Sequence, residues 1–198
     1  MMRPEVAVFL DAPRLGALKP RLAAEVGERH ALRLYRILAA RTLEAIERAG
    51  LDATVWFAPP DAAATMRFWL GEGRRLVPQA SGDLGARLAT SLRAVAPGRG
   101  WLLVAHDCPG LDAACLEEAA GHVARGDPVL GPTQDGGYYL LGGGAPLPDL
   151  FGAMPWGSGR VLGETRARLA HAGRVWHELA TLRSVETAAD ARALGLLT

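Results

Sequence analysis

The chain has 198 residues, of which 49% are hydrophobic, with 22 Lys+Arg against 21 Asp+Glu. This length suits one domain of residues 1–198, and the apolar fraction excludes a disordered chain. The net charge of +1 argues against a nucleic-acid partner, which usually selects a basic surface. Two cysteines are too few for a disulfide framework, so we expect a protein of the reducing cytoplasm.

Neither a secretory signal nor a membrane span is expected near the first residue. The apolar run at 6–10 is interrupted by Asp11. Secretory signals need about 7–15 consecutive apolar residues and membrane helices need about 20. We therefore expect no contact with a membrane.

The first half of the chain alternates short apolar runs with helical patterns. The order predicted is a strand at 6–10, a helix at 29–49, a strand at 53–57, a helix from about 61 to 71, a strand at 75–78 and a helix at 84–95. The loop from Asp11 to Arg21 separates the first two of these elements.

The second half continues in the same way. A strand is predicted at 101–105, a helix at 112–125, strands at 128–131 and 138–141, a helix at 158–172, a strand at 175–179 and a helix at 187–194. This alternation predicts a layered α/β domain, in which ligands bind beyond the carboxyl ends of the strands. The strands at 6–10 and 101–105 are the most apolar, so the segments that follow them are expected at one edge of the sheet.

The loop after the first strand is a candidate phosphate site. Gly16 lets the backbone approach a ligand, and Lys19 and Arg21 add positive charge. Lys19 is the single lysine among the 22 basic residues, and lysine differs from arginine in reach and hydration. The segment is not a Walker loop, because the second glycine and the Gly-Lys-Ser/Thr ending are absent. The alternative to a phosphate site is a solvated Pro/Gly loop with ordinary surface cations.

Asp107 follows the strand at 101–105 and is a candidate metal ligand. Mg²⁺ often takes only one or two protein carboxylates, with phosphates and water completing its shell. An Asx turn or a helix cap is the alternative. The five histidines show no spacing typical of a metal site in the sequence.

Three glycine-containing segments each allow two interpretations. Residues 135–137, Asp-Gly-Gly, would line a substrate cleft or form a hairpin turn. Residues 82–87 would lie close to a flat base or form a plain turn. Residues 155–158 would offer an aromatic surface and a hydroxyl, or a packed tryptophan with a helix-capping serine.

Five segments occur together and in order. They are Lys19-x-Arg21-Leu22, Gly82-Asp83-Leu84-Gly85-x-Arg87, Asp107-Cys108-Pro109-Gly110-Leu111, Gly131-Pro132 followed by Asp135-Gly136-Gly137-Tyr138-Tyr139-Leu140-Leu141-Gly142, and Pro155-Trp156-Gly157-Ser158. As a set they resemble a bacterial glycosyltransferase-like family of uncharacterised domains associated with arsenosugar biosynthesis. That family is similar to the nucleotide-diphospho-sugar transferases of GT-A fold and is related to molybdenum-cofactor and phospholactate guanylyltransferases.

The resemblance implies a single-domain, Rossmann-like α/β/α sandwich with a mixed sheet. It also implies an enzyme dependent on Mg²⁺ or Mn²⁺ that moves the sugar of a nucleotide-sugar donor to a small acceptor. Two alternatives stay open, namely nucleotidyl transfer to a phosphorylated small molecule and a non-catalytic nucleotide-binding module. A homo-oligomer is equally left open.

The resemblance also assigns roles to residues. Lys19, Arg21 and Asp107 would be catalytic, and Asp107 and Glu186 would ligate the metal. The substrate-binding residues would be Asp11, Gly16, Gly82, Asp83, Leu84, Gly85, Arg87, Asp135, Gly136, Gly137, Trp156 and Ser158.

The chain departs from the family pattern at several of these places. The pattern usually has Lys where this chain has Asp11, Pro where it has Leu15 and Thr where it has Pro20. It usually has Ser or Thr in place of His106, and Asp-x-Asp in place of Ser184-x-Glu186. The exchange at Asp11 replaces a cation with an anion, which should weaken phosphate binding through Coulomb repulsion.

Overall fold

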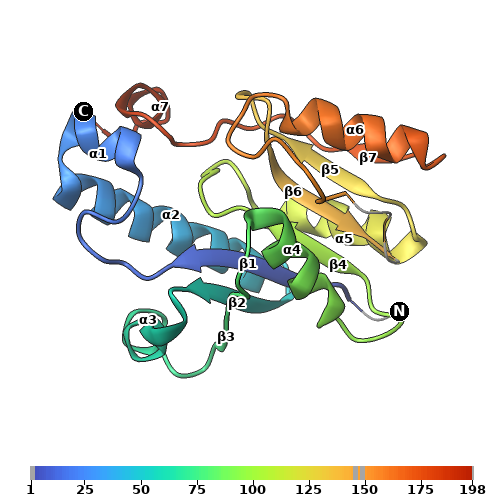
Figure 1. Ribbon diagram of the computed structural model, residues 1–198, viewed down its shortest axis with the longest axis horizontal. Helices are drawn as coiled ribbons and strands as arrows, with labels where there is room; N and C mark the ends of the chain where they lie inside the picture. Colours follow the sequence, from blue (N-terminus) through green and yellow to red (C-terminus); the bar gives the residue numbers. More distant parts are fainter. Residues whose placement is uncertain (1–2, 145–146, 148–149, 198) are drawn as a thin grey trace.

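The computed structural model describes residues 3–144, 147 and 150–197. Within these residues, seven strands form one sheet in the order β3-β2-β1-β4-β6-β5-β7 (Figure 1). They are β1 (Glu5–Asp11), β2 (Asp52–Ala58), β3 (Arg75–Pro78), β4 (Trp101–Val104), β5 (Val129–Pro132), β6 (Tyr138–Gly143) and β7 (His177–Glu178). The sheet is mixed, because β6 is antiparallel to both of its neighbours and the other pairs are parallel.

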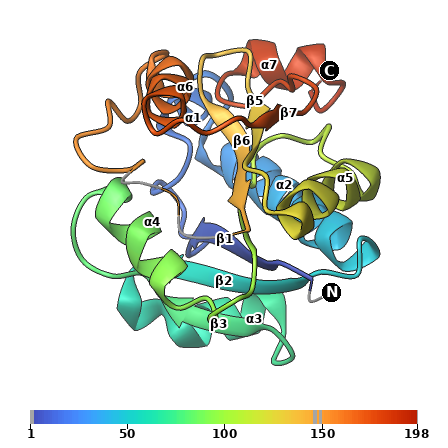
Figure 2. The same ribbon diagram turned by 90° about the vertical axis from the view of Figure 1, so that its right-hand side faces the viewer.

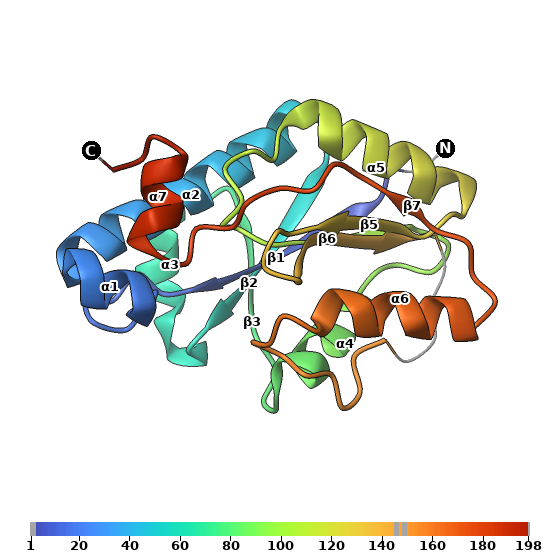
Figure 3. The same cartoon turned by 90° about the horizontal axis from the view of Figure 1, so that it is seen from above.

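Helices cover both faces of this sheet. They are α1 (Pro20–Val26), α2 (Glu28–Arg48), α3 (Ala63–Leu70), which follows the 3₁₀ turn η1 (Pro60–Ala62), α4 (Leu84–Arg93), α5 (Ala113–Arg125), α6 (Val161–His171) and α7 (Ala188–Ala193). Figure 3 shows α2 and α5 above the sheet and α4 and α6 below it. The same division is seen from the side, with α4 on one face of β1 and β2 and α2 and α5 on the other (Figure 2).

The alternation of side chains along β1 explains these three layers. Val6 and Val8 pack in the apolar core shared with α2 and α5, while Ala7 packs in the core shared with α4 and α6. Successive side chains of a strand point to opposite faces, so a strand that is apolar throughout its middle, as β1 is from Val6 to Leu10, has helices on both sides. The α/β/α sandwich with a mixed sheet is thereby confirmed.

A third apolar cluster lies beside the sheet. It joins α1, α2 and α7 through the buried side chains of Leu22, Leu34, Leu38, Val185, Ala188 and Ala191. Figures 1 and 3 show α1 and α7 next to each other, far from the middle of the sheet. The cluster therefore holds the segment before α7 against the start of α1, although these segments lie at opposite ends of the chain.

The strand order reverses direction between β1 and β4. The chain runs from β1 outward to β2 and β3, and then returns to the other side of β1 as β4. In open α/β sheets, ligands bind at such a switch point, outside the carboxyl ends of the two strands. The loops that follow β1 and β4 are the two expected at one edge of the sheet.

Several predicted boundaries are wrong. The loop predicted up to residue 21 contains the start of α1, and the helix predicted from Ser158 begins at Val161. The last strand shrinks from 175–179 to His177–Glu178, because Val175 is 87% exposed and does not reach the core. The helix predicted to end at residue 95 ends at Arg93.

No helix of the described residues has both the length and the apolar character needed to cross a bilayer.

Candidate functional site at the switch point

Lys19 lies between two carboxylates from distant parts of the chain. Its Nζ donates to Asp107 Oδ2 at 2.9 Å and to Glu186 Oε1 at 2.5 Å. The side chain of Lys19 is only 7% exposed, against 19% for Asp107 and 36% for Glu186. This contact brings together the loop after β1, the loop after β4 and the segment before α7.

The backbone of Lys19 is in an unusual conformation. Lys19 is the N-cap of α1 with φ 46° and ψ 60°, in the left-handed region that residues with a side chain rarely adopt. The following Pro20 also disfavours a right-handed helical conformation at Lys19. Such strain persists where the surroundings over-determine it, and the ion pairs of the Lys19 ammonium with Asp107 and Glu186 do so here.

The three charged groups change one another's proton affinity. Burial lowers the pKa of Lys19, but the charges of Asp107 and Glu186 outweigh burial, so the net pKa is raised. Burial raises the pKa of Asp107, yet the Lys19 charge more than compensates and the net pKa is lowered. Burial also raises the pKa of Glu186, which stays raised although Lys19 opposes it. Glu186 is therefore the carboxylate of this pair that takes up a proton first as the pH falls.

A third carboxylate is tied to the same segment. Asp135 Oδ2 accepts a hydrogen bond from Ser184 Oγ at 2.9 Å, and the backbone N–H of Val185 donates to the carbonyl of Asp107 at 2.9 Å. Residues 184–186 thus run between Asp107 and Asp135. The carboxylate of Asp135 also accepts from Thr133 Oγ1 at 2.5 Å, which fixes its orientation at the turn between β5 and β6.

Tyr35 on α2 fixes the ends of β1 and β4. Its buried hydroxyl donates to the carbonyl of Asp11 at 2.8 Å and accepts from the N–H of the same residue at 2.8 Å. Its ring meets that of His106 edge to face, with centroids 4.9 Å apart. Burial lowers the pKa of His106 to about 4, so this histidine is neutral at pH 7. His106 therefore acts as a packed residue beneath Asp107.

Arg87 reaches the same edge from α4. Its Nη1 donates to Gln79 Oε1 at 2.6 Å, and Gln79 Nε2 donates to the carbonyl of Trp56 at 3.0 Å. Burial raises the pKa of Asp11, and the charge of Arg87 acts against this rise. Arg87 thus partly offsets the anion that Asp11 places at the end of β1.

The residues just before Arg87 have local structural tasks. Asp83 caps α4, because its side chain accepts the N–H of Ala86 at 2.8 Å. Gly82 has φ 109°, a conformation that favours glycine. Leu84 packs, partly buried, against the core shared with α4 and α6. A Cβ on Gly85 would lie 2.3 Å from the carbonyl oxygen of Phe151, so Gly85 admits the loop before α6.

That loop holds Trp156 and Ser158. Trp156 stacks on Phe151 with centroids 6.5 Å apart, and its indole N–H is buried without a hydrogen-bond partner among the described residues. The hydroxyl of Ser158 donates to the carbonyl of Pro155 at 2.7 Å. It closes a turn there, and Arg160 is the N-cap of α6.

The glycines after Asp135 shape the turn between β5 and β6. Gly136 has φ 82°, and a Cβ there would lie 2.2 Å from the carbonyl oxygen of Gly159. The N–H of Gly137 donates to Asp135 Oδ1 at 3.2 Å. The hairpin interpretation of 135–137 therefore holds, and the same hairpin presents Asp135 to Ser184.

Arg21 and Gly16 also lie outside the cluster around Lys19. Arg21 is exposed on the first turn of α1, and Gly16, with φ 77°, faces the carboxylate of Glu28. Neither pairs with Asp107 or Glu186 among the described residues. Gln79 and Tyr35 were not predicted. Gln79 could have been found, because it directly follows a predicted strand, whereas Tyr35 was indistinguishable from a core residue.

Comparisons with known proteins agree with this architecture. The model of a family described as an uncharacterized protein conserved in bacteria (DUF2064) matches residues 42–158. The chain belongs to this family. The matched range holds four of the five segments that carry the resemblance, whereas Lys19 precedes it. No curated protein sequence matches the chain significantly.

Solved structures extend the likeness to the whole chain. A protein from Desulfovibrio desulfuricans G20, provisionally described as a nucleotide-diphospho-sugar transferase, is 28% identical with a TM-score of 0.90. The match covers 98% of this chain and 87% of that one. This relative bears out the expectation of an enzyme of the transferase class.

Two more distant structures share the fold. A nucleotidyl transferase from Methanothermobacter thermautotrophicus is 22% identical with a TM-score of 0.57, over 96% of this chain and 95% of that one. Rv0371c from Mycobacterium tuberculosis H37Rv, solved as a manganese complex, is 20% identical with a TM-score of 0.57, over 96% and 97%.

Proposed function

We propose that this family member is a metal-dependent transferase that moves the sugar of a nucleotide-sugar to a small acceptor. The observation that supports this most strongly is the cluster of Lys19, Asp107 and Glu186 at the switch point of the sheet. A fold of this class binds its ligand at that edge, so the charged cluster lies where donor phosphates would arrive.

The charge of the cluster favours a divalent cation. Asp107 and Glu186 contribute two carboxylates, and the Lys19 ammonium contacts both of them. Asp135, bound to the neighbouring Ser184, adds a third carboxylate nearby. Carboxylate oxygens suit Mg²⁺ and Mn²⁺, and one or two of them suffice when phosphates complete the shell. Asp107 and Glu186 fit this requirement, because their oxygens converge on one cation. The manganese complex of Rv0371c is consistent with this assignment.

Each residue of the cluster then has a defined task. Asp107 and Glu186 would hold the metal, which when bound supplies positive charge to the phosphates of the leaving group. Lys19, held by its two ion pairs, is positioned to add a second positive charge beside those phosphates. Arg87 brings a guanidinium group to the end of β1, beside Asp11, and guanidinium is well suited to phosphate. Arg21, exposed two residues from Lys19, is a second candidate for such a contact.

We place the acceptor beside Asp135, on the side of Asp107 away from the donor phosphates. Asp135 lies at the turn between β5 and β6, where Ser184 and Thr133 orient its carboxylate. An oriented carboxylate can accept a hydrogen bond from a sugar or acceptor hydroxyl. The segment that follows the turn at 155–158 lies against this hairpin, where Gly159 approaches Gly136. We therefore assign Trp156 and Ser158 to the acceptor as well.

Nucleotidyl transfer is the second candidate, favoured by the likeness to the nucleotidyl transferase of Methanothermobacter thermautotrophicus. In that reaction a phosphorylated acceptor attacks the α-phosphate of a nucleoside triphosphate, and pyrophosphate leaves. In glycosyl transfer the nucleoside diphosphate leaves instead. The same cluster of cation and carboxylates would serve either leaving group.

Product analysis tests the proposal. The protein is incubated with Mn²⁺ and either nucleotide-sugars or nucleoside triphosphates, together with a set of small hydroxylated or phosphorylated acceptors. Release of nucleoside diphosphate with a glycosylated product supports the proposal, and release of pyrophosphate supports the second candidate. Absence of both products with every donor would leave a non-catalytic nucleotide-binding module and would overturn the proposal.

A further inference from the structure

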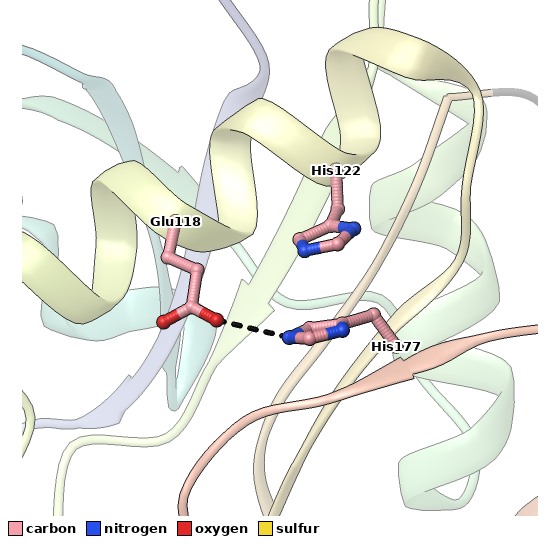
Figure 4. Close-up of side chains that lie close together, drawn as sticks. All are labelled: Glu118, His122 and His177. Carbon is pink, nitrogen blue, oxygen red and sulfur yellow. Dashed lines mark hydrogen bonds and ion pairs between the residues drawn. The ribbon is translucent and has the colours of Figure 1, made fainter.

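Three metal-ligating side chains gather at an edge of the molecule away from Lys19. Glu118 and His122 lie on α5, and His177 begins β7. One ligand atom from each lies within 4.8 Å of the others (Figure 4). This cluster was not predicted from the sequence, although Glu118 and His122 have the spacing of neighbours on one helical face.

The local structure of α5 and β7 explains why these side chains meet. Residues four apart on a helix lie one turn apart on the same face, which places Glu118 beside His122. β7 runs parallel to β5, with His177 opposite Val129, and the N–H of His177 donates to the carbonyl of Pro128 at 2.9 Å. Regular elements on both sides therefore fix the positions of the three side chains.

The side chains already face one another. His177 Nε2 lies 2.9 Å from Glu118 Oε1, and the rings of His122 and His177 stack 3.7 Å apart with an interplanar angle of 11°. Figure 4 shows that stacking brings a nitrogen of His122 over the nitrogen of His177 that contacts Glu118. Two imidazole nitrogens and one carboxylate oxygen thus lie close together, and the stacked rings would tilt apart so that both nitrogens point at one ion.

We propose that Glu118, His122 and His177 bind a Zn²⁺ ion. Two histidines and one carboxylate are a ligand set that zinc uses, whereas Mg²⁺ and Ca²⁺ prefer oxygen ligands alone. Zinc sites of this kind have distances of about 2.0–2.2 Å, so the ion would draw the three side chains closer together. Water completes the tetrahedral shell, since the Glu118 side chain is 53% exposed.

Neighbouring charges are compatible with this ion. Asp127 lies 3.8 Å from His122 Nδ1, and a closer approach would let its carboxylate accept the N–H of a metal-bound imidazole and fix its tautomer. Arg125 Nη2 now lies 3.0 Å from the same nitrogen. Because the Arg125 side chain is 57% exposed, it can turn to Asp127, which it already approaches at 3.7 Å.

The zinc site would link α5 to the edge of the sheet. His177 pairs with the first residue of β5, whereas Asp135 follows the last residue of that strand, so the two sites lie toward opposite ends of β5. The ion would cross-link a two-residue edge strand to a 13-residue helix. Its binding is therefore separate from the proposed transferase chemistry at Lys19.

Zinc titration of the metal-free protein tests this proposal. Calorimetry with Zn²⁺, and the visible absorption of bound Co²⁺, would be measured for the native protein and for His122→Gln and His177→Gln. His171→Gln, which changes an exposed histidine on α6, is the matched control. Asp107→Asn weakens the separate metal site proposed at Asp107 and Glu186, so it distinguishes binding there from binding at the histidines. Thermal unfolding without metal verifies that every variant folds.

We expect one Zn²⁺ per chain at Glu118, His122 and His177, with a Co²⁺ absorption typical of tetrahedral coordination. Binding at this site should weaken about ten-fold or more in both cluster variants. Saturating Zn²⁺ should raise the Tm of the native protein by roughly 5–10 °C, and this shift should vanish in the cluster variants. His171→Gln should bind Zn²⁺ as the native protein does, and Asp107→Asn should keep the Zn²⁺ that the two histidines bind. Absence of zinc binding, or binding that both cluster variants retain unchanged, would overturn the proposal.

Discussion

The ammonium of Lys19 lies 2.9 Å from the carboxylate of Asp107, a residue 88 positions further along the chain. The contact joins the loops that follow β1 and β4, the two neighbouring strands between which the strand order reverses. Because the Lys19 side chain is only 7% exposed, its charge is balanced by protein groups and only slightly by water. Removal of any member of this cluster should therefore change both stability and cation binding.

Lys19→Met should destabilise the protein and strengthen its binding of divalent cations. The substitution leaves Asp107 and Glu186 close together without their shared cation. We expect a loss of about 2 kcal/mol in the free energy of unfolding, less than for a fully buried pair because Glu186 is 36% exposed. Mn²⁺ can replace the lost charge, so it should restore much of this stability. Urea unfolding with and without Mn²⁺ measures both effects.

Arg21→Ala is the control for this experiment. Arg21 is also basic and lies two residues away, but it is exposed and outside the ion pairs of Lys19. Its stability should stay within about 0.5 kcal/mol of the native value. Equal stability of Lys19→Met and the native protein in the absence of metal would contradict the role given to the ion pairs.

Asp107→Asn should remove metal-dependent turnover while the fold is kept. Asparagine has the same shape but lacks the charge that binds Lys19 and the proposed metal. We expect turnover to fall by about a hundred-fold or more, as for the loss of one strong electrostatic contact in an active site. Asp112→Asn is the matched control, because Asp112 caps α5 and asparagine caps helices equally well. Unchanged turnover in Asp107→Asn would exclude Asp107 from the mechanism.

Gly85→Ala should destabilise the protein, whereas Gly163→Ala should not. A Cβ at Gly85 would lie 2.3 Å from the carbonyl oxygen of Phe151, and overpacking of this kind costs about 1–3 kcal/mol. Gly163 is also helical, but a Cβ there meets no atom within 4 Å, so alanine should stabilise α6 by about 0.5–1 kcal/mol. Chemical unfolding of both variants should give changes of opposite sign. A stable Gly85→Ala variant would show that the loop before α6 is free to move away.

Asp190→Ala should lower stability at neutral pH but not in acid. Asp190 forms a capping box with Thr187, accepting its hydroxyl at 2.7 Å and its N–H at 3.0 Å. Burial raises the pKa of Asp190, but these hydrogen bonds outweigh burial and the net pKa is lowered. Because the pKa of Asp190 is lower in the folded state, its stabilisation is fully present above the unfolded-state pKa, near 3.8. The stabilisation is lost as the pH falls from there through the folded-state pKa.

We expect the variant to lose about 1 kcal/mol at pH 7. Urea unfolding at several pH values should show the two proteins converging as Asp190 becomes protonated in the native chain. A difference that is constant over this range would mean that the ionised carboxylate is not what stabilises α7.

Much of the fold could be predicted from the sequence because buried strands have a strong local signal. The runs at 6–10 and 101–105 lie within or next to β1 and β4, which helices cover on both faces. α1 was missed because it has only seven residues and begins at Lys19-Pro20, a pair that is typical of loops. Its stability comes from Leu22 packing in the cluster with α7, a contact that local sequence does not encode.

The sequence predicted which residues belong to the candidate site better than it predicted which of them contact one another. Lys19, Asp107 and Glu186 were each selected, but their convergence depends on α1, α2 and α7 packing together. Asp83 and Ser158 illustrate the opposite case. Each is a polar residue near the proposed ligand segments, yet each makes a local contact, as a helix cap and within a turn.

The most direct measurement of the central claim is thermal unfolding with a panel of nucleotides and nucleotide-sugars, each with Mn²⁺ or with EDTA. A ligand at 100 times its Kd adds about 2.7 kcal/mol, which corresponds to a Tm shift of roughly 5–10 °C for a chain of this length. We predict such a shift for at least one nucleotide-sugar, dependent on Mn²⁺ and absent in Asp107→Asn. No shift with any nucleotide, or a shift independent of both Mn²⁺ and Asp107, would contradict a metal-dependent nucleotide site at the ends of β1 and β4.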